Sequence, residues 1–568
     1  MGQHRDALQV AFEDPTTSDE ENFMFEPPGM SAQQPEPDSD PREFTWRGIL
    51  AHLGPAFLVS IGYLDPGNWA TDIEGGSRFG YKLLWVLIVA NFMALLLQVL
   101  AARMGIVTRC HLAELCRDEY PRPANLALWV MAEFAIIATD LTEVLGTAIG
   151  INLLFNIPLM VGVVLTALDT FLLLTAQSQG MRRVEQVIFV FLGIISVCFI
   201  IELFMSKPDI GKIATGVFVP RIDSQSLYVA TAIVGATVMP HNFYLHSALV
   251  IERVPDRRPG TLRAECKYNL VDTAIALNAA LFINCAILII AAANFWESGV
   301  EVTTLSKAYH LLENTGVKIG NLDLAPVLFG IALVASGQSS TLCGTLAGQY
   351  VMEGFLDLRA PPIIRRLITR LVAIVPALLV ISAMGDTGTY QLLIMCQVVL
   401  SLQLPFAIVP MIRFTNSKRR MQDFRNTPLV STLAWTAAGI AVCLNIAYVL
   451  HLLWQGIQSG VASIRVVSLA CGLPLFLSLS AFLAWIALRT ETGGAGAVYR
   501  LEDDDDFGSA LDYELDSLGS PIGSAPGQPS PMVEPLSFGE EHGENLEDIL
   551  MLDRQALALS QRRTKTGT

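Results

Sequence analysis

Long apolar runs separated by short polar segments repeat along most of the chain. "LLWVLIVANFMALLLQVLAA" from Leu83 and "VIFVFLGIISVCFIIELFM" from Val187 each have about the 20 residues that a helix needs to cross roughly 30 Å of hydrocarbon. The pattern predicts an all-α polytopic membrane protein. We expect about twelve membrane-spanning helices, at 48–76, 82–104, 125–153, 158–176, 186–206, 226–252, 270–296, 324–350, 366–385, 390–414, 429–454 and 464–488.

Two of these runs contain a proline at a corresponding depth. The first includes "GYLDPGNWA", with Pro66 and Gly67 in its middle, and the sixth includes "GATVMPHNFYLH", with Pro240. Proline lacks a backbone donor and clashes with the preceding turn, so helices 1 and 6 are expected to be broken. Breaks five spans apart predict two inverted repeats of five helices, with about two extra C-terminal helices and a site between the breaks. Ordinary proline kinks are the alternative, but both breaks also carry polar side chains.

Composition supports the membrane interpretation and separates two tails from the apolar part. Only 16% of the residues are charged, against about 25% in soluble proteins, and 52% are hydrophobic, with a mean hydropathy of +0.47. Much of the net charge of −16 lies in "EDPTTSDEENFMFEPP" and "EDDDDFGSALDYELDSLGSP". We expect disordered acidic tails at 1–45 and 491–568 and a transmembrane domain at 46–490. Nothing in the chain indicates nucleic-acid binding, and any partners of the tails stay open.

The basic residues predict an orientation. If the N-terminus is cytoplasmic, the inside loops hold most of the loop Arg and Lys, and the loops after spans three and nine hold none, as the positive-inside rule requires. An even number of spans then places both termini in the cytoplasm, in a membrane that the sequence does not identify. The inside residues are Arg103, Arg109, Arg117, Arg122, Arg182, Arg183, Arg253, Arg257, Arg258, Arg263, Lys267, Arg365, Arg366, Lys418, Arg419, Arg420 and Arg425.

The sequence shows no sign of an enzyme. The nine cysteines are scattered, no CxxC pair occurs, and several lie within apolar runs, where they are typical packing residues. We find no nucleophile–base pair, phosphate loop or zinc-binding spacing. We therefore expect neither catalysis nor a resident cofactor.

The polar residues at the two breaks are suited to a metal cation. Asp65 and Asn68 flank the first break and Met239 the second. An aspartate at the bilayer midplane costs several kcal/mol without a partner, and a cation is the obvious one. Carbonyls near Gly62 and Ala236 would complete the shell. Oxygen ligands alone suit Ca2+ or Mg2+, whereas an added thioether favours softer first-row metals. A single buried Met is usually core packing, so the prediction depends on the whole set.

"DPGNWATDIEGG" followed by "GATVMPHNFYLHSAL" resembles the Nramp family (natural resistance-associated macrophage proteins). The resemblance runs from about Gly48 to the last spans and excludes the tails. It implies a LeuT-like fold and proton-coupled transport of divalent metals by alternating access. The expected substrates are Mn2+ or Fe2+, with protons and the lipid bilayer as the other partners.

The resemblance also implies a set of metal ligands. Asp65 and Asn68 of the first motif, Met239 and the carbonyl of Ala236 in the second, and Gln397 in "CQVVLSLQLPF" match the residues that bind metal in the family. Relatives that carry Mg2+ or Al3+ lack the Met. At position 62 some relatives have Ala, which changes little because the ligand would be a carbonyl.

A second group of titratable residues predicts a proton pathway. His241 and His246 follow the second break, and either is a candidate to titrate near neutral pH. Glu133, Asp140 and Glu143 are seven and three positions apart, so they share one face of the third helix. Intramembrane carboxylates in such a row mark proton relays.

The resemblance implies that Asp140 and Glu143 belong to a proton exit route near arginines of the ninth helix. Arg365, Arg366 and Arg370 are the candidates. A structural acid–arginine network that ties helices together is the alternative, and the two roles are compatible. Asp72 and Glu74 either attract cations to an external vestibule or are ordinary helix-end charges.

Two other functions remain possible on the same pattern. An amino-acid or cation symporter of this fold would not need an Asp and a Met at the breaks. A metal-sensing signalling protein with an Nramp-like domain would be favoured by a long soluble C-terminal domain, whereas the tail here is short and acidic. Proton-coupled metal transport is therefore the favoured prediction.

Overall fold

The described residues form an almost entirely helical bundle, as predicted. The computed structural model describes residues 54–167, 181–254, 259–299, 302, 304–312, 318–319, 322–358, 362–459 and 461–490. The tails predicted at 1–45 and 491–568 lie outside these residues. The described strands are β1 (Lys318–Ile319) and β2 (Leu322–Asp323), which pair antiparallel in one short hairpin.

The main helices, some of them short pieces of broken or irregular spans, follow the apolar runs. They are α2 (Pro55–Gly62), α3 (Pro66–Phe79), α4 (Leu84–Thr108), α6 (Arg122–Phe155), α8 (Met181–Ser206), α10 (Leu227–Val238), α11 (Pro240–Leu249), α12 (Pro259–Ala291), α14 (Leu324–Leu356), α15 (Pro362–Asn416), α17 (Pro428–Gln458), α18 (Ala462–Val467) and α19 (Leu473–Leu488).

Short helices connect the long ones. They are η1 (Gly80–Leu83), α5 (Leu112–Glu119), α9 (Ile210–Phe218), η2 (Ile251–Arg253), the π-helix η3 (Ala292–Trp296), α13 (Leu305–Leu312), α16 (Lys418–Met421), η5 (Gln422–Phe424) and the π-helix η6 (Ser468–Gly472). The helices η3 and η6 fall inside the predicted spans 270–296 and 464–488, whereas most of the others lie between predicted spans.

Among the described residues, eight helices are long and apolar enough to cross a membrane. This number is compatible with the predicted spans for three reasons. The fourth span falls partly on residues 168–180, outside the described part, and each broken span consists of two short pieces. The helix α15 covers the predicted ninth and tenth spans, which meet at Gly385, where the backbone has φ 62° and ψ −149°. Glycine accepts this positive φ without the penalty that a Cβ would bring.

Both predicted breaks are present. The helix α2 ends at Gly62 and α3 begins at Pro66, while α10 ends at Val238 and α11 begins at Pro240. The fold class predicted from the sequence, with helices 1 and 6 broken, is therefore confirmed.

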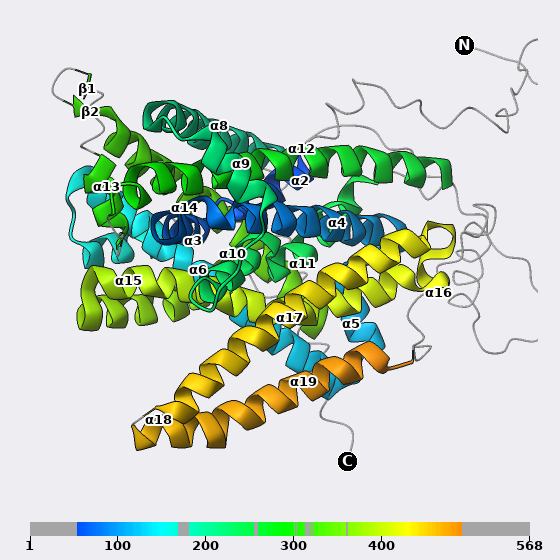
Figure 1. The fold of residues 1–568 in the computed structure, drawn as a ribbon. Helices are drawn as coiled ribbons and strands as arrows, with labels where there is room; N and C mark the ends of the chain where they lie inside the picture. The colour runs from blue at the N-terminus through cyan, green and yellow to red at the C-terminus, as the bar shows by residue number, and fades with distance from the viewer. Residues whose placement is uncertain are drawn as a thin grey trace, which may run out of the picture. The chain divides into compact units, whose positions relative to one another are not determined.

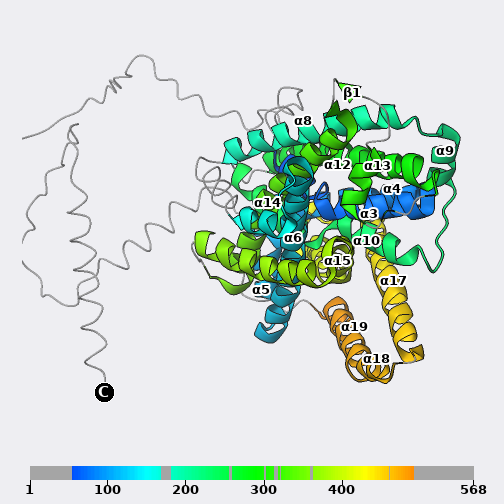
Figure 2. The same ribbon diagram turned by 90° about the vertical axis from the view of Figure 1, so that its left-hand side faces the viewer.

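The helices place the two breaks inside the bundle. The helix α6 packs against α14 and α15, and α10 packs against α15 and α4. Figure 1 shows α3 and α13 toward one end of the bundle and α5 and α16 toward the other, and α9 packs against η1, which follows α3. Figure 2 looks onto the first of these ends, which we call the α9 end. In both views α17 and α19 lie along one flank, and apolar side chains such as Leu475 and Leu477 are exposed there, as expected of a surface that faces lipid.

Candidate metal and proton sites

The first break holds the carboxylate of Asp65 in a fixed position. Asp65 caps α3, with its Oδ1 accepting a hydrogen bond of 2.8 Å from the backbone N–H of Asn68. Its Oδ2 accepts from Thr142 Oγ1 at 2.8 Å and from Gln397 Nε2 at 3.1 Å. The side chain is fully buried. Three helices therefore converge on one carboxylate.

Side chains from other helices replace the helical donors that the first break removes. The carbonyl of Tyr63 accepts from the Nδ2 groups of Asn68 and Asn284. The carbonyl of Leu64 accepts from Ser336 Oγ. The carbonyl groups freed at the break therefore have hydrogen-bond donors, as backbone buried at membrane depth requires.

The second break places a thioether and a carbonyl in the interior. Met239, between α10 and α11, has φ 40° and is fully buried. A positive φ is uncommon for a residue other than glycine, and the surrounding packing must hold Met239 in it. Its Sδ accepts from Asn242 Nδ2 at 3.5 Å. The carbonyl of Ala236 stands four residues before Pro240, whose nitrogen has no hydrogen to donate.

Direct contacts join the ligand candidates of the two breaks. Gln397 of α15 bonds to Asp65, and the backbone of Gln397 packs against Gly235, beside Ala236. Asn242 contacts Gly62 as well as Met239, since its Nδ2 lies 2.8 Å from where a Cβ on residue 62 would be. All six candidates, which are Asp65, Asn68, Gly62, Ala236, Met239 and Gln397, therefore lie at or against the paired breaks.

Several buried oxygens around the breaks lack a hydrogen-bond partner among the described residues. They are Gln397 Oε1, Asn242 Oδ1 and Thr237 Oγ1. Buried polar atoms are normally paired, so such acceptors indicate a place for a ligand. No group of three or more His, Cys, Asp or Glu suited to a metal occurs in the described part of the chain. A cation here would have one carboxylate and otherwise neutral donors.

The two histidines after the second break have different surroundings. His241 is buried, with its Nδ1 3.4 Å from Thr139 Oγ1, and it interacts electrostatically with Asp140. Its Nε2 has no hydrogen-bond partner in the described residues. His246 lies between two amide side chains, Gln98 Oε1 at 2.9 Å and Asn269 Nδ2 at 3.2 Å. His241 is therefore the histidine that links the break to the carboxylates of α6.

The acids of α6 meet one of the three candidate arginines. Asp140 and Glu143 are fully buried, and Glu143 Oε2 lies 3.6 Å from Nη1 of the equally buried Arg370. Glu133 is only partly buried and accepts a hydrogen bond of 3.1 Å from Trp129 Nε1. Arg365 and Arg366 lie in α15, but their side chains are outside the described residues.

Asp72 and Glu74 are buried inside the bundle, so they are not solvated helix-end charges. Glu74 accepts from Arg78 at 2.8 Å and from Tyr390 Oη at 3.1 Å. Tyr390 and Gln397 are seven residues apart on α15, so both contact α3 from the same face. These contacts hold α3 against α15 on the α9 side of Asp65.

The sequence analysis missed several neutral polar residues of the site. Thr142, Asn242, Asn284 and Ser336 all contact the breaks. Each stands within an apolar run, where single Thr, Ser and Asn residues are common in membrane helices. The sequence did indicate that such residues must exist, because the backbone N–H and C=O groups freed at the two breaks need polar partners inside the bundle.

Comparisons with known proteins identify relatives of this chain. The family profile "Natural resistance-associated macrophage protein-like" matches residues 56–451. The natural resistance-associated macrophage protein 2 homolog of Dictyostelium discoideum is 48% identical over 448 residues, covering 78% of this chain and 70% of that protein. The divalent metal cation transporter MntH of Bradyrhizobium diazoefficiens is 49% identical over 406 residues, covering 71% and 89%. The crystal structure of an Eremococcus coleocola manganese transporter superposes with a TM-score of 0.70 at 34% identity, covering 78% of this chain and 94% of that one.

Proposed function

The chain belongs to the natural resistance-associated macrophage protein (Nramp) family and is an integral multi-pass membrane protein, and from this premise we propose that it transports Mn2+ or Fe2+ together with protons by alternating access. The metal ion and the protons are its substrates, and we expect no resident cofactor.

One observation carries the proposal: the two breaks meet around one buried carboxylate, that of Asp65, and the other candidate ligands there are neutral. Asp65 supplies the charge, and Gln397, Asn68 and the carbonyl of Ala236 are neutral oxygen donors. Met239 adds the soft sulfur that favours first-row transition metals over Ca2+ and Mg2+. An amino-acid carboxylate would be repelled by Asp65.

The contacts around the site also support alternation between two states. Asp65 and Glu74 of α3 are bonded to Gln397 and Tyr390 of α15. In this closed arrangement Asp65, Asn68 and Met239 are buried. We infer that α3 leaves α15 when the site opens at the α9 end, and that this end faces away from the cytoplasm, with both termini cytoplasmic.

The decisive experiment is uptake by proteoliposomes that contain a metal-sensitive dye and a pH dye. We expect Mn2+, Fe2+ and Cd2+ to enter together with protons, and Ca2+ and Mg2+ to be excluded. Entry of Mn2+ without acidification of the lumen would contradict proton coupling, and equal entry of all five ions would contradict the proposed ligand set.

We expect Met239→Ala to reduce selectivity more than Mn2+ transport. A thioether is a weak ligand for Mn2+, but it discriminates against hard cations. The preference for Mn2+ over Ca2+ should fall about tenfold or more, which corresponds to about 1.4 kcal/mol. The measurement is inhibition of Mn2+ uptake by Ca2+.

Met104→Ala is the matched control, because Met104 is fully buried in α4. It creates a cavity beside α4, a helix that contributes none of the proposed metal ligands, so its selectivity should equal that of the wild type. Unchanged exclusion of Ca2+ by Met239→Ala would show that the sulfur does not contribute to selectivity.

We expect Glu143→Gln to lower proton flux at least about tenfold while metal affinity changes little, because the swap keeps the shape and removes the titratable group. Asp140→Asn should act in the same direction. Glu143 forms an ion pair with Arg370 at 3.6 Å and is not one of the proposed metal ligands. The two-dye uptake assay measures both fluxes, and calorimetry measures Mn2+ affinity.

Glu353→Gln removes a carboxylate near the C-terminal end of α14, where Glu353 accepts from Gln349 at 3.0 Å, and should leave both fluxes unchanged. Thermal unfolding of Glu143→Gln is measured in parallel, because Arg370 loses a buried partner. Unchanged proton flux in Glu143→Gln and Asp140→Asn would favour the structural acid–arginine network.

A further inference from the structure

A buried carboxyl group outside the metal site and the α6 acids has no hydrogen-bond partner in the described part of the chain. Glu202 lies in α8, four residues before its last residue, and is 3% exposed. Neither Oε1 nor Oε2 forms a hydrogen bond with a described residue. A carboxylate in such a place is strongly disfavoured, whereas a neutral carboxylic acid is tolerated.

Glu202 lines a small internal cavity at the α9 end. The cavity has a volume of about 10 Å3, close to the space that one water molecule needs. Its other lining residues are all apolar and come from α3, α8, α12, η3, α13 and α14. They are Ile73, Phe199, Ile287, Ile290, Ala291, Phe295, Ala308 and Phe329.

A π-helix forms part of the same wall. The helix α12 ends at Ala291, and η3 continues as a π-helix through Phe295 and Trp296. π-helices are rare and are frequently found at functional sites. The π-helix η3 and the carboxyl of Glu202 therefore line the same cavity.

The charged and titratable groups near this cavity offer Glu202 no hydrogen bond. On its own helix the nearest is Cys198, one turn earlier. On α3, Asp72 and Glu74 flank Ile73, and Glu74 is bonded to Arg78 and Tyr390. The remaining groups are Cys285 on α12, Glu297 after η3, and Lys307 and Tyr309 beside Ala308 on α13.

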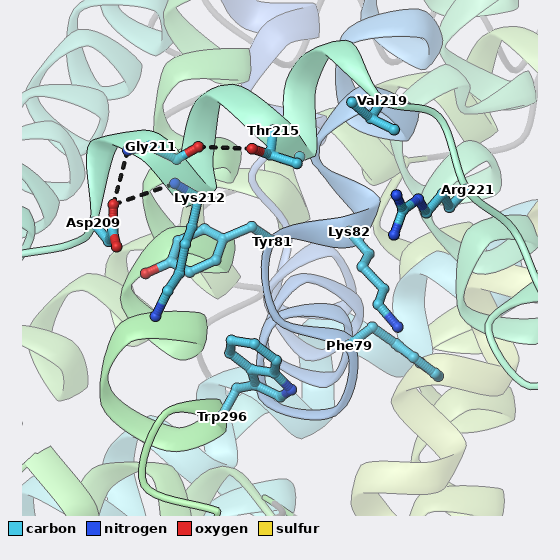
Figure 3. Close-up of a pocket in the computed structure, with 11 residues that line it drawn as sticks. Phe79, Tyr81, Lys82, Asp209, Gly211, Lys212, Thr215, Val219, Arg221 and Trp296 are labelled. Carbon is cyan, nitrogen blue, oxygen red and sulfur yellow. Dashed lines mark hydrogen bonds between the residues drawn. The ribbon is translucent and has the colours of Figure 1, made fainter.

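A larger surface cavity lies on the other side of η3. It has a volume of about 310 Å3 between η1, α9 and η3, and Figure 3 shows Tyr81, Lys212 and Trp296 around it. Lys212 Nζ lies 2.9 Å from Glu297 Oε1, a hydrogen bond that raises the pKa of Lys212. Phe295 lines the Glu202 cavity and the next residue, Trp296, lines the surface cavity, so η3 contributes to the walls of both.

One wall of the Glu202 cavity, which we call its cover, is formed by Ile73 of the broken helix. Ile73 belongs to α3, which packs so closely on α12 that a Cβ on Gly76 would lie 2.4 Å from the carbonyl oxygen of Leu288. In the proposed transport cycle α3 moves away from its neighbours, and water then reaches Glu202. The inference rests on the proposed function at this one step.

We propose that Glu202 is a proton-binding site, separate from the α6 acids, that stabilises the closed packing of α3 when it is protonated. On closure the carboxylate takes a proton from hydronium at the α9 end, which gives the neutral acid and one water molecule. On opening, the hydrated acid returns the proton to water. The closed state binds one more proton than the open state, so it is favoured at low pH and loses stability as the pH rises.

The test measures how fast a cysteine in the cover is labelled. Ile73→Cys is introduced into the full-length protein in nanodiscs, and its reaction with a membrane-impermeant maleimide is followed by peptide mass spectrometry over a range of pH. The same reporter is combined with Glu202→Gln and with Glu202→Met, which fills the cavity without an amide. Asp386→Asn, which removes an exposed carboxylate at the same end, is the control.

At each pH, the labelling rate of each variant is divided by the rate of the Glu202→Gln variant. This ratio removes the pH dependence of the thiol itself, because every variant carries the same cysteine. With Glu202 present, the ratio should rise with pH by up to about tenfold per unit, the limit for one linked proton. Asp386→Asn should follow the same curve, and Glu202→Met should follow Glu202→Gln. Infrared difference spectra should show a carboxylic-acid C=O band at acidic pH that Glu202→Gln lacks.

A ratio that does not change with pH overturns the proposal, and so does a band that persists in Glu202→Gln. Mn2+ uptake by the same variants separates this outcome from failure of the proposed function. A flat ratio with normal wild-type uptake rejects only the role of Glu202, whereas absent uptake by the wild type rejects the transport proposal.

Discussion

Asp65→Asn is expected to lower Mn2+ affinity at least about a hundredfold and to abolish measurable uptake. Loss of one partner from a buried charge pair costs roughly 3–5 kcal/mol, and each 1.4 kcal/mol is about tenfold in affinity. Asp65 is the carboxylate on which Thr142 and Gln397 converge. Calorimetric titration with Mn2+ and uptake into proteoliposomes measure the two effects.

Comparison with Asp65→Ala separates the charge from the helix cap. Asn is a good N-cap and can still accept from the N–H of Asn68, whereas Ala cannot, at a cost of about 1 kcal/mol. Both variants should lose metal binding, but Asp65→Ala should also unfold at a lower temperature. If Asp65→Asn folds normally and binds Mn2+ with wild-type affinity, the metal site is not at the first break.

The breaks were predictable because proline has a local effect. Pro66 and Pro240 end a helix wherever it lies, and Asp65 at the midplane is costly in any fold. The positions of α2, α3, α10 and α11 therefore followed from the sequence pattern. The pairing of the breaks also followed, since equal spacing in two repeats is visible along the chain.

The partners of the breaks were not predictable because they depend on helix packing. Thr142, Asn284 and Ser336 are 77, 221 and 272 residues from the atoms that they contact. No local pattern distinguishes them from packing residues. For the same reason the sequence could not distinguish Arg370 from Arg365 and Arg366. Arg370 is buried against Glu143 because α15 packs beside α6. The π-helix η3 was not predictable either, because it contains no proline or glycine that would indicate an irregular turn.

The close approach of α3 and α15 leads to the second large effect, at Gly67. A Cβ on residue 67 would lie 1.7 Å from Gln397 Nε2 and 3.0 Å from Asp65 Oδ2. The Gln397 amide ends a flexible side chain, so it can move aside, but it then loses its bond to Asp65. We expect Gly67→Ala to fold and to bind Mn2+ about ten- to one hundredfold more weakly, the usual cost of disturbing the support of a metal ligand.

Gly75→Ala is the matched control on the same helix, because its added Cβ meets side-chain atoms no closer than 3.5 Å. It should bind Mn2+ like the wild type. A double-mutant cycle with Gln397→Ala then tests the cause, since the added methyl has no amide to displace when Gln397 is absent. Gly67→Ala should have a much smaller effect in the Gln397→Ala background than in the wild type. Additive losses would show that Gly67 acts through the backbone of α3 and not through Gln397, and unchanged affinity in Gly67→Ala alone would show that Gln397 does not support the metal ligand.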